Sequence, residues 1–505
     1  MQSEIIKFNK ILVANRGEIA IRILRAISEL NIKTVAIYTY EDRYSLHRYK
    51  ADEAYMVGNE EEPLSPYLDI EAVISVAKRK NVDAIHPGYG FLSENSNFIK
   101  KVTEAGLKFI GPSYQSVELM GNKTSARALM RKNNVPIVPG TTESIRSFEE
   151  AKKIALEIGL PIMIKASAGG GGKGMRKITK IEELEQGIER AKNEAEKSFG
   201  NSSVYIEKFI ENPKHIEVQI LGDEHGNYIH LFERECSIQR RHQKVVEEAP
   251  SSSINDELRT KVTNIALNAA KACNYYNAGT IELLYDQNES FYFLEMNTRL
   301  QVEHPITEMI TGVDIVKEQI KIASGETLSI KQNDIKLNGC AIECRIYAED
   351  VDNNFAPSIG NIMHHRLPSG PGIRIDRGID ILSEVSIYYD PMLSKLIAWG
   401  RNREEAIARM KQALSAYQIA GVKTNINFFY WILDHPIFLD STFDNNFLEN
   451  YFLPLVPNKW RENVNKEYIK VSAILGAFIK SQEKSLKTKK LCSSKNNNWG
   501  MQIYE

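Results

Sequence analysis

Hydrophobic and polar positions follow two different periods at the start of the chain. Residues 10–15 (KILVAN) and 33–38 (KTVAIY) are continuous apolar runs, typical of strands that are buried on both faces. Between them, apolar residues recur every three or four positions over residues 18–30, which predicts an amphipathic helix. A strand, a helix and a second strand in this order predict a βαβ unit with parallel strands.

The pattern continues as an α/β domain over residues 1–120. Apolar runs at 82–86 and 107–110 predict further strands, and the spacing over 70–79 predicts a helix. The sequence GxGxxG does not follow the first strand, so nothing here predicts a nicotinamide dinucleotide site.

Three further parts follow this domain, as expected for a chain of 505 residues, which is too long for one hydrophobic core. Residues 121–325 contain a stretch rich in glycine. Residues 326–453 open with strand-like segments and include a predicted helix at 403–417. In residues 454–505 lysines outnumber acidic residues, and we expect a mobile or partner-docking tail rather than a catalytic element.

The glycine stretch reads KASAGGGGKGMRK from Lys165. A P-loop would need glycine and a hydroxyl residue where this chain has Ser167 and Gly174, so that pattern fails twice. The segments 161–166 and 175–178 on either side are strand-like, which predicts a β-hairpin with the glycines at its tip. Backbone N–H groups without neighbouring side chains can approach phosphate oxygens closely, and Lys165 can add a charge. A plain flexible loop is the alternative.

Residues 291–303 alternate between polar and apolar positions. One face of such a strand would carry Phe291, Phe293, Glu295, Asn297, Arg299, Gln301 and Glu303. Glu282, in a neighbouring strand-like segment, is expected beside Glu295, and two carboxylates at 4 Å repel by about 4 kcal/mol. Oxygen ligands from Glu282, Glu295 and Asn297 suit Mg²⁺, which would face a second pocket with Arg299 as cation and Glu303 as base. A solvated strand face is the alternative.

Two charged segments predict no chemistry by their pattern alone. Residues 233–248 (ERECSIQRRHQKVVEE) are dense in charge, which is typical of a solvated face. Residues 339–350 alternate like a strand, with Glu343 and Arg345 opposite two cysteines. A lone arginine in that position is normally a surface ion-pair partner.

Composition and charge exclude some partners. The 64 basic and 65 acidic residues give a net charge of −1, so we expect neither nucleic acid nor a membrane as partner. No apolar run predicts a signal peptide or a membrane span. The five cysteines form no CxxC pair, and Cys340 and Cys344 are expected to be buried thiols. A reducing compartment such as the cytoplasm fits this usage.

Several long motifs, in order, resemble the biotin carboxylase family, the ATP-grasp subunits or domains of acetyl-CoA, propionyl-CoA and pyruvate carboxylases. They are HPGYGFLSEN (86–95), the glycine stretch, EKFIENPKHIEVQ (207–219), SIQRRHQKVVEEAP (237–250) and EMNTRLQVEHPITEMITG (295–312). The resemblance covers about 10–453. It implies an α/β protein with a Rossmann-like N-terminal (pre-ATP-grasp) domain at 1–120, an ATP-grasp domain at 121–325 with a mobile glycine-rich lid near 140–208, and a C-terminal biotin carboxylase domain at 326–453.

The resemblance implies three sets of site residues and reverses the interpretation of both charged segments. The nucleotide set is Lys123, Lys165, Gly170, Gly171, Gly172, Glu207, Lys208, Ile210, His215, Gln239, His242 and Leu284. The bicarbonate and biotin set is Tyr89, Lys244, Arg299, Gln301, Val302, Glu303 and Arg345, of which Lys244, Arg299, Glu303 and Arg345 are the expected catalytic residues. The set for Mg²⁺ or Mn²⁺ is Glu282, Glu295 and Asn297.

The implied activity is that of an ATP-dependent ligase, which phosphorylates bicarbonate to carboxyphosphate and then carboxylates biotin. The Met410-Lys411 pair lies in a helical pattern, so biotin is expected on a separate carrier protein, with a separate carboxyltransferase. A homodimer is implied, with Arg22, Arg25 and Glu29 in its interface region. The tail favours an acetyl- or propionyl-CoA carboxylase of fatty acid biosynthesis, and a split pyruvate carboxylase is the alternative.

Two rival classes remain open. Another ATP-grasp ligase, such as a carbamoyl-phosphate or dipeptide synthetase, would share the lid and the metal carboxylates. It would lack the combination of Lys244, the 299–303 segment and Arg345. A nucleotide-binding regulator without activity would need no base at Glu303.

Overall fold

This computed structural model describes residues 5–167, 175–457, 460, 474, 476–478 and 480–481. The chain forms two compact units, Met1–Pro454 and Leu455–Glu505, and every element discussed below belongs to the first. Most of the second unit lies outside the described residues, so partner docking by the tail stays a prediction. Among the described helices, none has the length and apolar character needed to cross a membrane.

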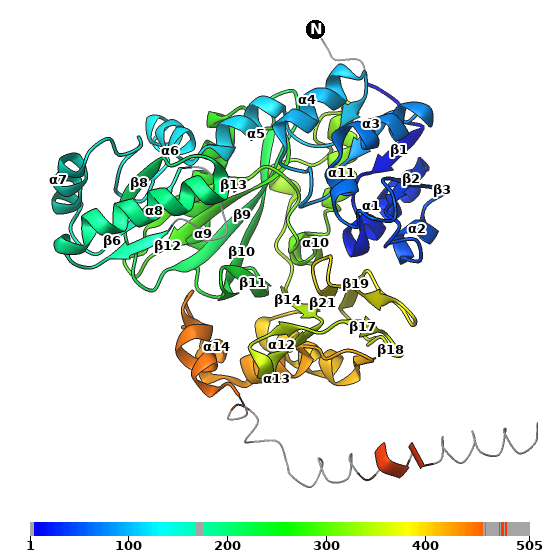
Figure 1. The fold of residues 1–505 in the computed structure, drawn as a ribbon. Helices are drawn as coiled ribbons and strands as arrows, with labels where there is room; N and C mark the ends of the chain where they lie inside the picture. Colours follow the sequence, from blue (N-terminus) through cyan, green and yellow to red (C-terminus); the bar gives the residue numbers. More distant parts are fainter. Residues whose placement is uncertain are drawn as a thin grey trace, which may run out of the picture. The chain divides into compact units, whose positions relative to one another are not determined.

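Five parallel strands form the N-terminal sheet, in the order β3-β2-β1-β4-β5 (Figure 1). The strands are β1 (Lys10–Val13), β2 (Lys33–Tyr38), β3 (Glu53–Met56), β4 (Ala84–His86) and β5 (Lys108–Phe109). Leu12 faces a core with helices α3 (Ile70–Arg79) and α4 (Ser96–Glu104). Its neighbours Ile11 and Val13 face α1 (Gly17–Glu29) and α11 (Ile315–Ala323). The predicted βαβ unit is therefore confirmed, and the sheet is buried on both faces.

A larger antiparallel sheet of eight strands follows, in the order β13-β12-β9-β10-β11-β14-β21-β19. Its strands are β9 (Lys214–Gly222), β10 (Tyr228–Arg240), β11 (Gln243–Ala249), β12 (Asn277–Tyr285), β13 (Phe291–Asn297), β14 (Cys340–Tyr347), β19 (Ile373–Arg377) and β21 (Met392–Gly400). Because β11 pairs with β14, this sheet runs without a break across the predicted boundary at residue 326. Helix α9 (Asp256–Ala272) packs on β9 and β10, and α12 (Arg403–Ala416) packs on β14 and β21.

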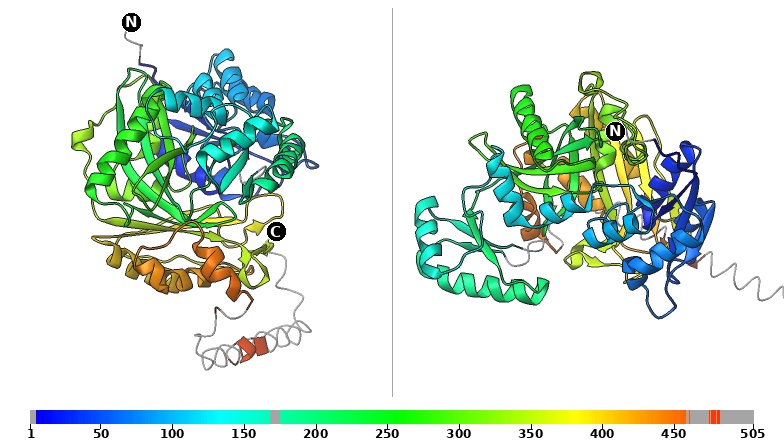
Figure 2. Two further views of the ribbon diagram at one scale, coloured as in Figure 1. Left: turned by 90° about the vertical axis from the view of Figure 1, so that its left-hand side faces the viewer. Right: turned by 90° about the horizontal axis from the view of Figure 1, so that it is seen from above.

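A three-stranded sheet, β7-β6-β8, makes a separate lobe with helices α7 (Phe148–Ile158) and α8 (Leu184–Phe199). Figures 1 and 2 show this lobe and the N-terminal sheet on opposite sides of the large sheet. Strand β6 (Ile162–Ala166) pairs antiparallel with β7 (Arg176–Ile178) on one side and with β8 (Val204–Lys208) on the other. The predicted hairpin is therefore confirmed, while its glycine tip, 168–174, lies outside the described residues.

Two expectations drawn from patterns alone are wrong. The alternating segment is a strand only as far as Asn297, because helix α10 (His304–Thr311) begins soon afterwards, with Glu303 as its N-cap residue and Pro305 in its first turn. The charged segment 233–248 is no solvated face, since it supplies inner strands β10 and β11 with buried acids and a buried Arg234. Pairing of opposite charges, invisible in the pattern, allows that burial. The buried state expected for Cys340 and Cys344 is confirmed.

Candidate active site

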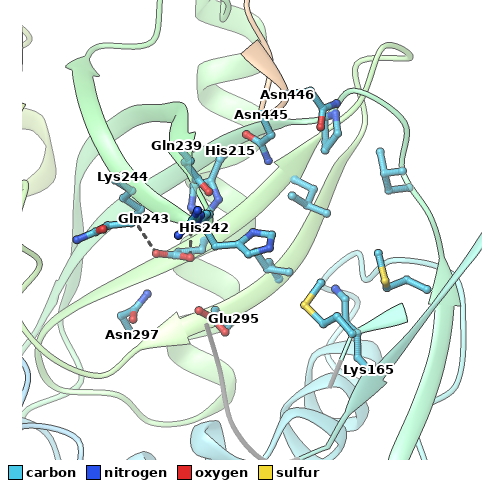
Figure 3. A pocket seen from close by; sticks show the side chains of 18 of the residues that line it. Lys165, His215, Gln239, His242, Gln243, Lys244, Glu295, Asn297, Asn445 and Asn446 are labelled. Carbon is cyan, nitrogen blue, oxygen red and sulfur yellow. Dashed lines mark hydrogen bonds and ion pairs between the residues drawn. The ribbon is translucent and has the colours of Figure 1, made fainter. Parts of the chain in front are cut away.

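A cavity of about 510 Å³ brings together nearly all predicted site residues. Those that line it are Lys123, Lys165, Glu207, Lys208, Ile210, His215, Gln239, His242, Lys244, Glu282, Leu284, Glu295, Asn297, Arg299, Gln301, Val302, Glu303 and Arg345. Figure 3 shows Lys165 on one side of this cavity, across from Lys244 and His215 on the other. Tyr89 does not line the cavity, and its hydroxyl donates a hydrogen bond to Glu18. Gly170, Gly171 and Gly172 lie outside the described residues.

The Lys244 ammonium is the centre of the site's charge. It donates hydrogen bonds to Glu217, to Glu282 Oε1 (2.9 Å) and to Glu303 Oε1 (2.6 Å). Burial alone would lower the pKa of Lys244, but the surrounding carboxylates raise it well above its usual value. One cation therefore joins strands β9, β11 and β12 to the start of α10.

Glu303 lies between two cations. Lys244 binds one of its oxygens, and Arg345 Nη2 donates to the other at 2.9 Å. Burial would raise the pKa of Glu303, but Lys244 and Arg345 outweigh that effect and hold it well below the usual value. Arg345 Nε also donates to Glu247 Oε1 at 2.6 Å, and burial raises the pKa of Glu247 to about 7 in spite of this contact. Glu303 is consequently ionised at neutral pH, as a base must be before it accepts a proton.

Arg299 reaches the cavity from the loop between β13 and α10. Its Nη1 donates to Gln301 Oε1 (2.8 Å) and its Nη2 to Asn297 Oδ1 (3.0 Å). From the N-terminal domain, Glu94 accepts from Arg299 Nε at 2.9 Å and from the Thr298 N–H at 3.1 Å. Glu94 belongs to the HPGYGFLSEN motif but was not singled out by sequence reasoning, and it fixes the direction of the guanidinium.

The predicted metal ligands are neighbours across two strands. Glu282 on β12 is directly opposite Glu295 on β13, and Thr280 is opposite Asn297. In this structure Glu282 accepts from Gln301 Nε2 (3.1 Å) as well as from Lys244, while Glu295 Oε2 lies 3.7 Å from Lys123 Nζ. Two carboxylates and an amide oxygen at the edge of one cavity form a donor set that fits Mg²⁺ or Mn²⁺.

The opposite end of the cavity is more apolar and is framed by the β8 hinge. Glu207 is buried between Lys165 and Arg127, whose Nη1 donates to it at 3.0 Å. Leu284 and Ile210 line this end together with residues that sequence reasoning missed, which are Met163, Phe209 and Leu294. Such a slot suits a flat, partly apolar group with lysine cations at its exit.

Asn445 and Asn446 also line the cavity, although they belong to the last segment of the first unit (Figure 3). The Asn445 N–H donates to the Pro213 carbonyl at 3.0 Å, and Asn446 Nδ2 donates to Asn212 Oδ1 at 3.1 Å. No sequence signal marks them, because their partners lie more than 200 residues earlier in the chain.

The residues predicted for a dimer interface differ in accessibility. Arg22 is buried within the chain, where its Nη2 donates to Glu308 (2.9 Å) and Asp314 (2.7 Å). Glu29 is exposed and pairs with Lys317 at 2.5 Å, and Arg25 is exposed. Arg25 and Glu29 are thus accessible to a second copy, while Arg22 supports the fold.

Comparisons with known proteins agree along most of the chain. Family profiles described as biotin carboxylase N-terminal domain, carbamoyl-phosphate synthase L chain ATP-binding domain and biotin carboxylase C-terminal domain match residues 7–117, 122–331 and 343–450. Biotin carboxylase 1 of Bacillus subtilis is 51% identical over 443 residues, which cover 88% of this chain and 98% of that protein. Pyruvate carboxylase of Staphylococcus aureus is 50% identical over 472 residues, which cover 92% of this chain but only 41% of that longer protein.

A similar fold has been solved. The biotin carboxylase domain dimer of Hydrogenobacter thermophilus 2-oxoglutarate carboxylase, in complex with MgADP, ADP and bicarbonate, has a TM-score of 0.85 to this chain at 50% identity. The match covers 89% of this chain and 98% of the solved one.

Proposed function

Because this chain belongs to the biotin carboxylase family of ATP-dependent ligases, we propose that it carboxylates biotin on a separate carrier protein, with ATP and bicarbonate as the other substrates. The observation that carries this proposal is the buried cluster in which Lys244 and Arg345 share Glu303. The cluster opens into the same cavity as the carboxylate pair Glu282 and Glu295. A nucleotide-binding regulator without activity would need the carboxylate pair Glu282 and Glu295 but not the Lys244–Glu303–Arg345 cluster.

The apolar end of the cavity would hold the adenine ring, with the phosphates directed toward Lys123 and Lys165. Both lysines contact carboxylates, Glu295 and Glu207, that phosphate oxygens would replace as their partners. Glu282, Glu295 and Asn297 would hold Mg²⁺ or Mn²⁺, which supplies positive charge against the phosphate oxygens when bound. The glycine-rich segment would cover the phosphates and exclude water from them.

Arg299, Gln301 and the Val302 N–H would bind bicarbonate, and Glu303 would accept its proton. The low pKa of Glu303 makes it a weak base as long as Lys244 and Arg345 interact with no other anion in the cavity. An incoming anion shares these cations and therefore raises the basicity of Glu303 when it is needed. The deprotonated bicarbonate then attacks the γ-phosphate of ATP, which gives carboxyphosphate and ADP.

Carboxyphosphate then breaks down to CO₂ and phosphate beside biotin. The phosphate would accept the proton of the biotin ureido nitrogen, and Arg345 would stabilise the resulting anion. The nitrogen attacks CO₂ and carboxybiotin forms.

We assign the reaction to the first half of an acetyl- or propionyl-CoA carboxylase, and the lysine-rich tail supports this assignment. The biotin carboxylase subunit of a split pyruvate carboxylase is the second candidate, supported by the 50% identity to a pyruvate carboxylase. In either case a biotin carboxyl carrier protein and a carboxyltransferase complete the reaction, and the catalytic chain is a homodimer.

Release of ADP by the purified chain tests the proposal. We expect ADP release to require bicarbonate and to rise on addition of free biotin, and Glu303→Gln to abolish both rates while MgADP still binds. Release that is indifferent to bicarbonate and biotin would favour another ATP-grasp ligase, and binding without turnover would favour a regulator. Transfer of the carboxyl group to acetyl-CoA or to pyruvate by the native partner subunits decides the acceptor.

A further inference from the structure

Two buried side chains, on the side away from the cavity, bind the backbone of the loop that carries the proposed bicarbonate site. His304 Nδ1 lies 2.7 Å from the Gln301 carbonyl oxygen, and Lys395 Nζ donates to the Val302 carbonyl oxygen at 2.8 Å. Both side chains are fully buried, and neither lines the cavity. Together with a longer bond from the His304 backbone N–H to the Gln301 carbonyl (3.4 Å), the two contacts fix the planes of two consecutive peptide groups.

The orientation of the Val302 N–H follows from these contacts. In a trans peptide the C=O and the N–H point in opposite directions. The Gln301 carbonyl is directed inward to His304, so the N–H of the same peptide group, that of Val302, is directed outward to the cavity that Val302 lines. Within the part of the chain that the structure describes, this N–H has no hydrogen-bond partner. A free donor aimed into a pocket that also presents Lys244, Arg299 and Arg345 is a ready contact for an anion.

The protonation state of His304 is fixed by its surroundings. Burial, with the nearby charges of Lys395 and Arg22, lowers the pKa of His304 well below its usual value, so the ring is neutral. Because a carbonyl oxygen only accepts, the ring's single proton must be on Nδ1. The other nitrogen, Nε2, is buried without a hydrogen-bond partner in the described structure.

Lys395 connects this loop to the rest of the molecule. Its ammonium lies 3.2 Å from Glu18 Oε2 on α1 and 4.0 Å from Asp376 Oδ2 on β19. A single buried cation on β21 thereby joins the loop to helix α1 and to strand β19. Displacement of either element would be transmitted to the Val302 carbonyl.

We propose that His304 and Lys395 are positioning residues that orient the peptide groups around Val302 and aim its N–H at bicarbonate. This inference rests on the proposed function, because it assumes that the anion binds at Val302. Neither residue touches the substrate, so the expected defect is one of bicarbonate affinity rather than of the nucleotide site.

Three substitutions of one residue test the inference. His304→Asn keeps an N–H donor near the position of Nδ1, His304→Gln moves the donor toward the unused Nε2 position, and His304→Leu removes it. We expect the bicarbonate KM in the ADP-release assay to rise roughly fivefold to tenfold in the Gln and Leu variants, and about twofold or less in Asn. The ATP KM and the affinity for MgADP should stay unchanged in all three.

Equal bicarbonate KM values in all variants, with bicarbonate dependence intact in the wild type, would overturn this inference alone. An ATP KM that rises in step with the bicarbonate KM would also overturn it, because that result indicates a general structural defect. A wild type without bicarbonate dependence would overturn the proposed function as well.

If His304 variants do not fold, Lys395→Met combined with Glu18→Gln provides the second test. The double change removes the donor to Val302 together with the Glu18 carboxylate that faces it, while Asp376 keeps its contact with Arg374. Glu18→Gln alone is its matched control. The double variant should show the raised bicarbonate KM, and the control should not. Identical bicarbonate KM values in both would refute the role of Lys395.

Discussion

Replacement of Arg345 by alanine separates the two proposed half-steps. Arg345 donates to Glu303 and Glu247 and supplies the donor that would stabilise the biotin anion. Loss of one such donor from a water-excluded site slows a reaction by roughly 100-fold to 1000-fold, or about 3–4 kcal/mol. We therefore expect biotin-stimulated ADP release by Arg345→Ala to fall by at least about 100-fold.

The bicarbonate-dependent reaction without biotin should respond differently. Arg345 is one of two cations that lower the pKa of Glu303, and Lys244 remains in the variant. The pKa of Glu303 must rise, yet the carboxylate stays ionised at neutral pH. Because a base works in its ionised form, the acid limb of the pH–rate profile follows this pKa and moves to higher pH. At pH 8 we expect a loss of less than about tenfold.

Two matched variants and one refuting outcome complete this experiment. Arg345→Lys keeps the charge but loses the fork of two donors, and it should restore only part of the biotin-dependent rate. Glu247→Gln removes the other carboxylate that Arg345 contacts and leaves the contact between Arg345 and Glu303. A melting curve for each variant shows whether it folds. If Arg345→Ala lost both rates equally while folded, the assigned role of Arg345 would be refuted.

Three other predictions concern the metal, the nucleotide and the fold. Glu295→Gln should raise the Mg²⁺ concentration needed for half-maximal ADP release by roughly tenfold without changing the bicarbonate KM; an unchanged Mg²⁺ requirement would remove Glu295 from the metal site. Asn445→Ala should raise the ATP KM by about twofold to fivefold at constant bicarbonate KM, and an unaltered ATP KM would show that lining the cavity is not contact. The charges of Arg374 and Lys395 outweigh burial and lower the pKa of Asp376 to about 2, so its ionisation stabilises the fold above pH ~4 and loses that effect as the pH falls toward 2. Asp376→Asn should therefore lower the free energy of unfolding at pH 7 by about 2 kcal/mol, which appears as a lower melting temperature. The difference in melting temperature from the wild type should narrow below pH ~4, and a difference independent of pH would contradict this.

The sequence predicted local structure best where one physical signal dominates. The strand at 33–38 and the helix at 70–79 have the predicted bounds, because a continuous apolar run marks the first and helical spacing of apolar residues marks the second. The strand predicted from Phe291 onward ends at Asn297, because a polar loop can alternate by chance. In the sequence only Pro305 signals that a helix begins at His304. Period-two patterns thus identify strands only where other residues confirm their ends.

Alternation over residues 291–303 predicted the metal ligands, Arg299 and Glu303, whereas motif resemblance supplied Lys244, Arg345 and most of the nucleotide set. Arg345 would have been assigned to the surface on its alternation alone, whereas it is buried between Glu247 and Glu303. Those partners lie 98 and 42 residues away in the chain, so no local rule connects them. Asn445 was missed for the same reason. Long-range pairing of charges decides which polar residues are buried, and that information is spread over the whole fold.

The ion pairs of the cavity also explain why anionic and cationic ligands should bind together. Lys123, Lys165 and Lys244 each contact a glutamate of the cavity, so these three cations are already paired with carboxylates. An anion that binds Lys123 or Lys244 competes with Glu295 or Glu282 for that lysine, so the carboxylate loses part of its compensating charge. A divalent cation between Glu282 and Glu295 would restore that charge and reduce the repulsion between the two carboxylates. Nucleotide and metal should therefore each strengthen the binding of the other, because one frees the partners that the other requires.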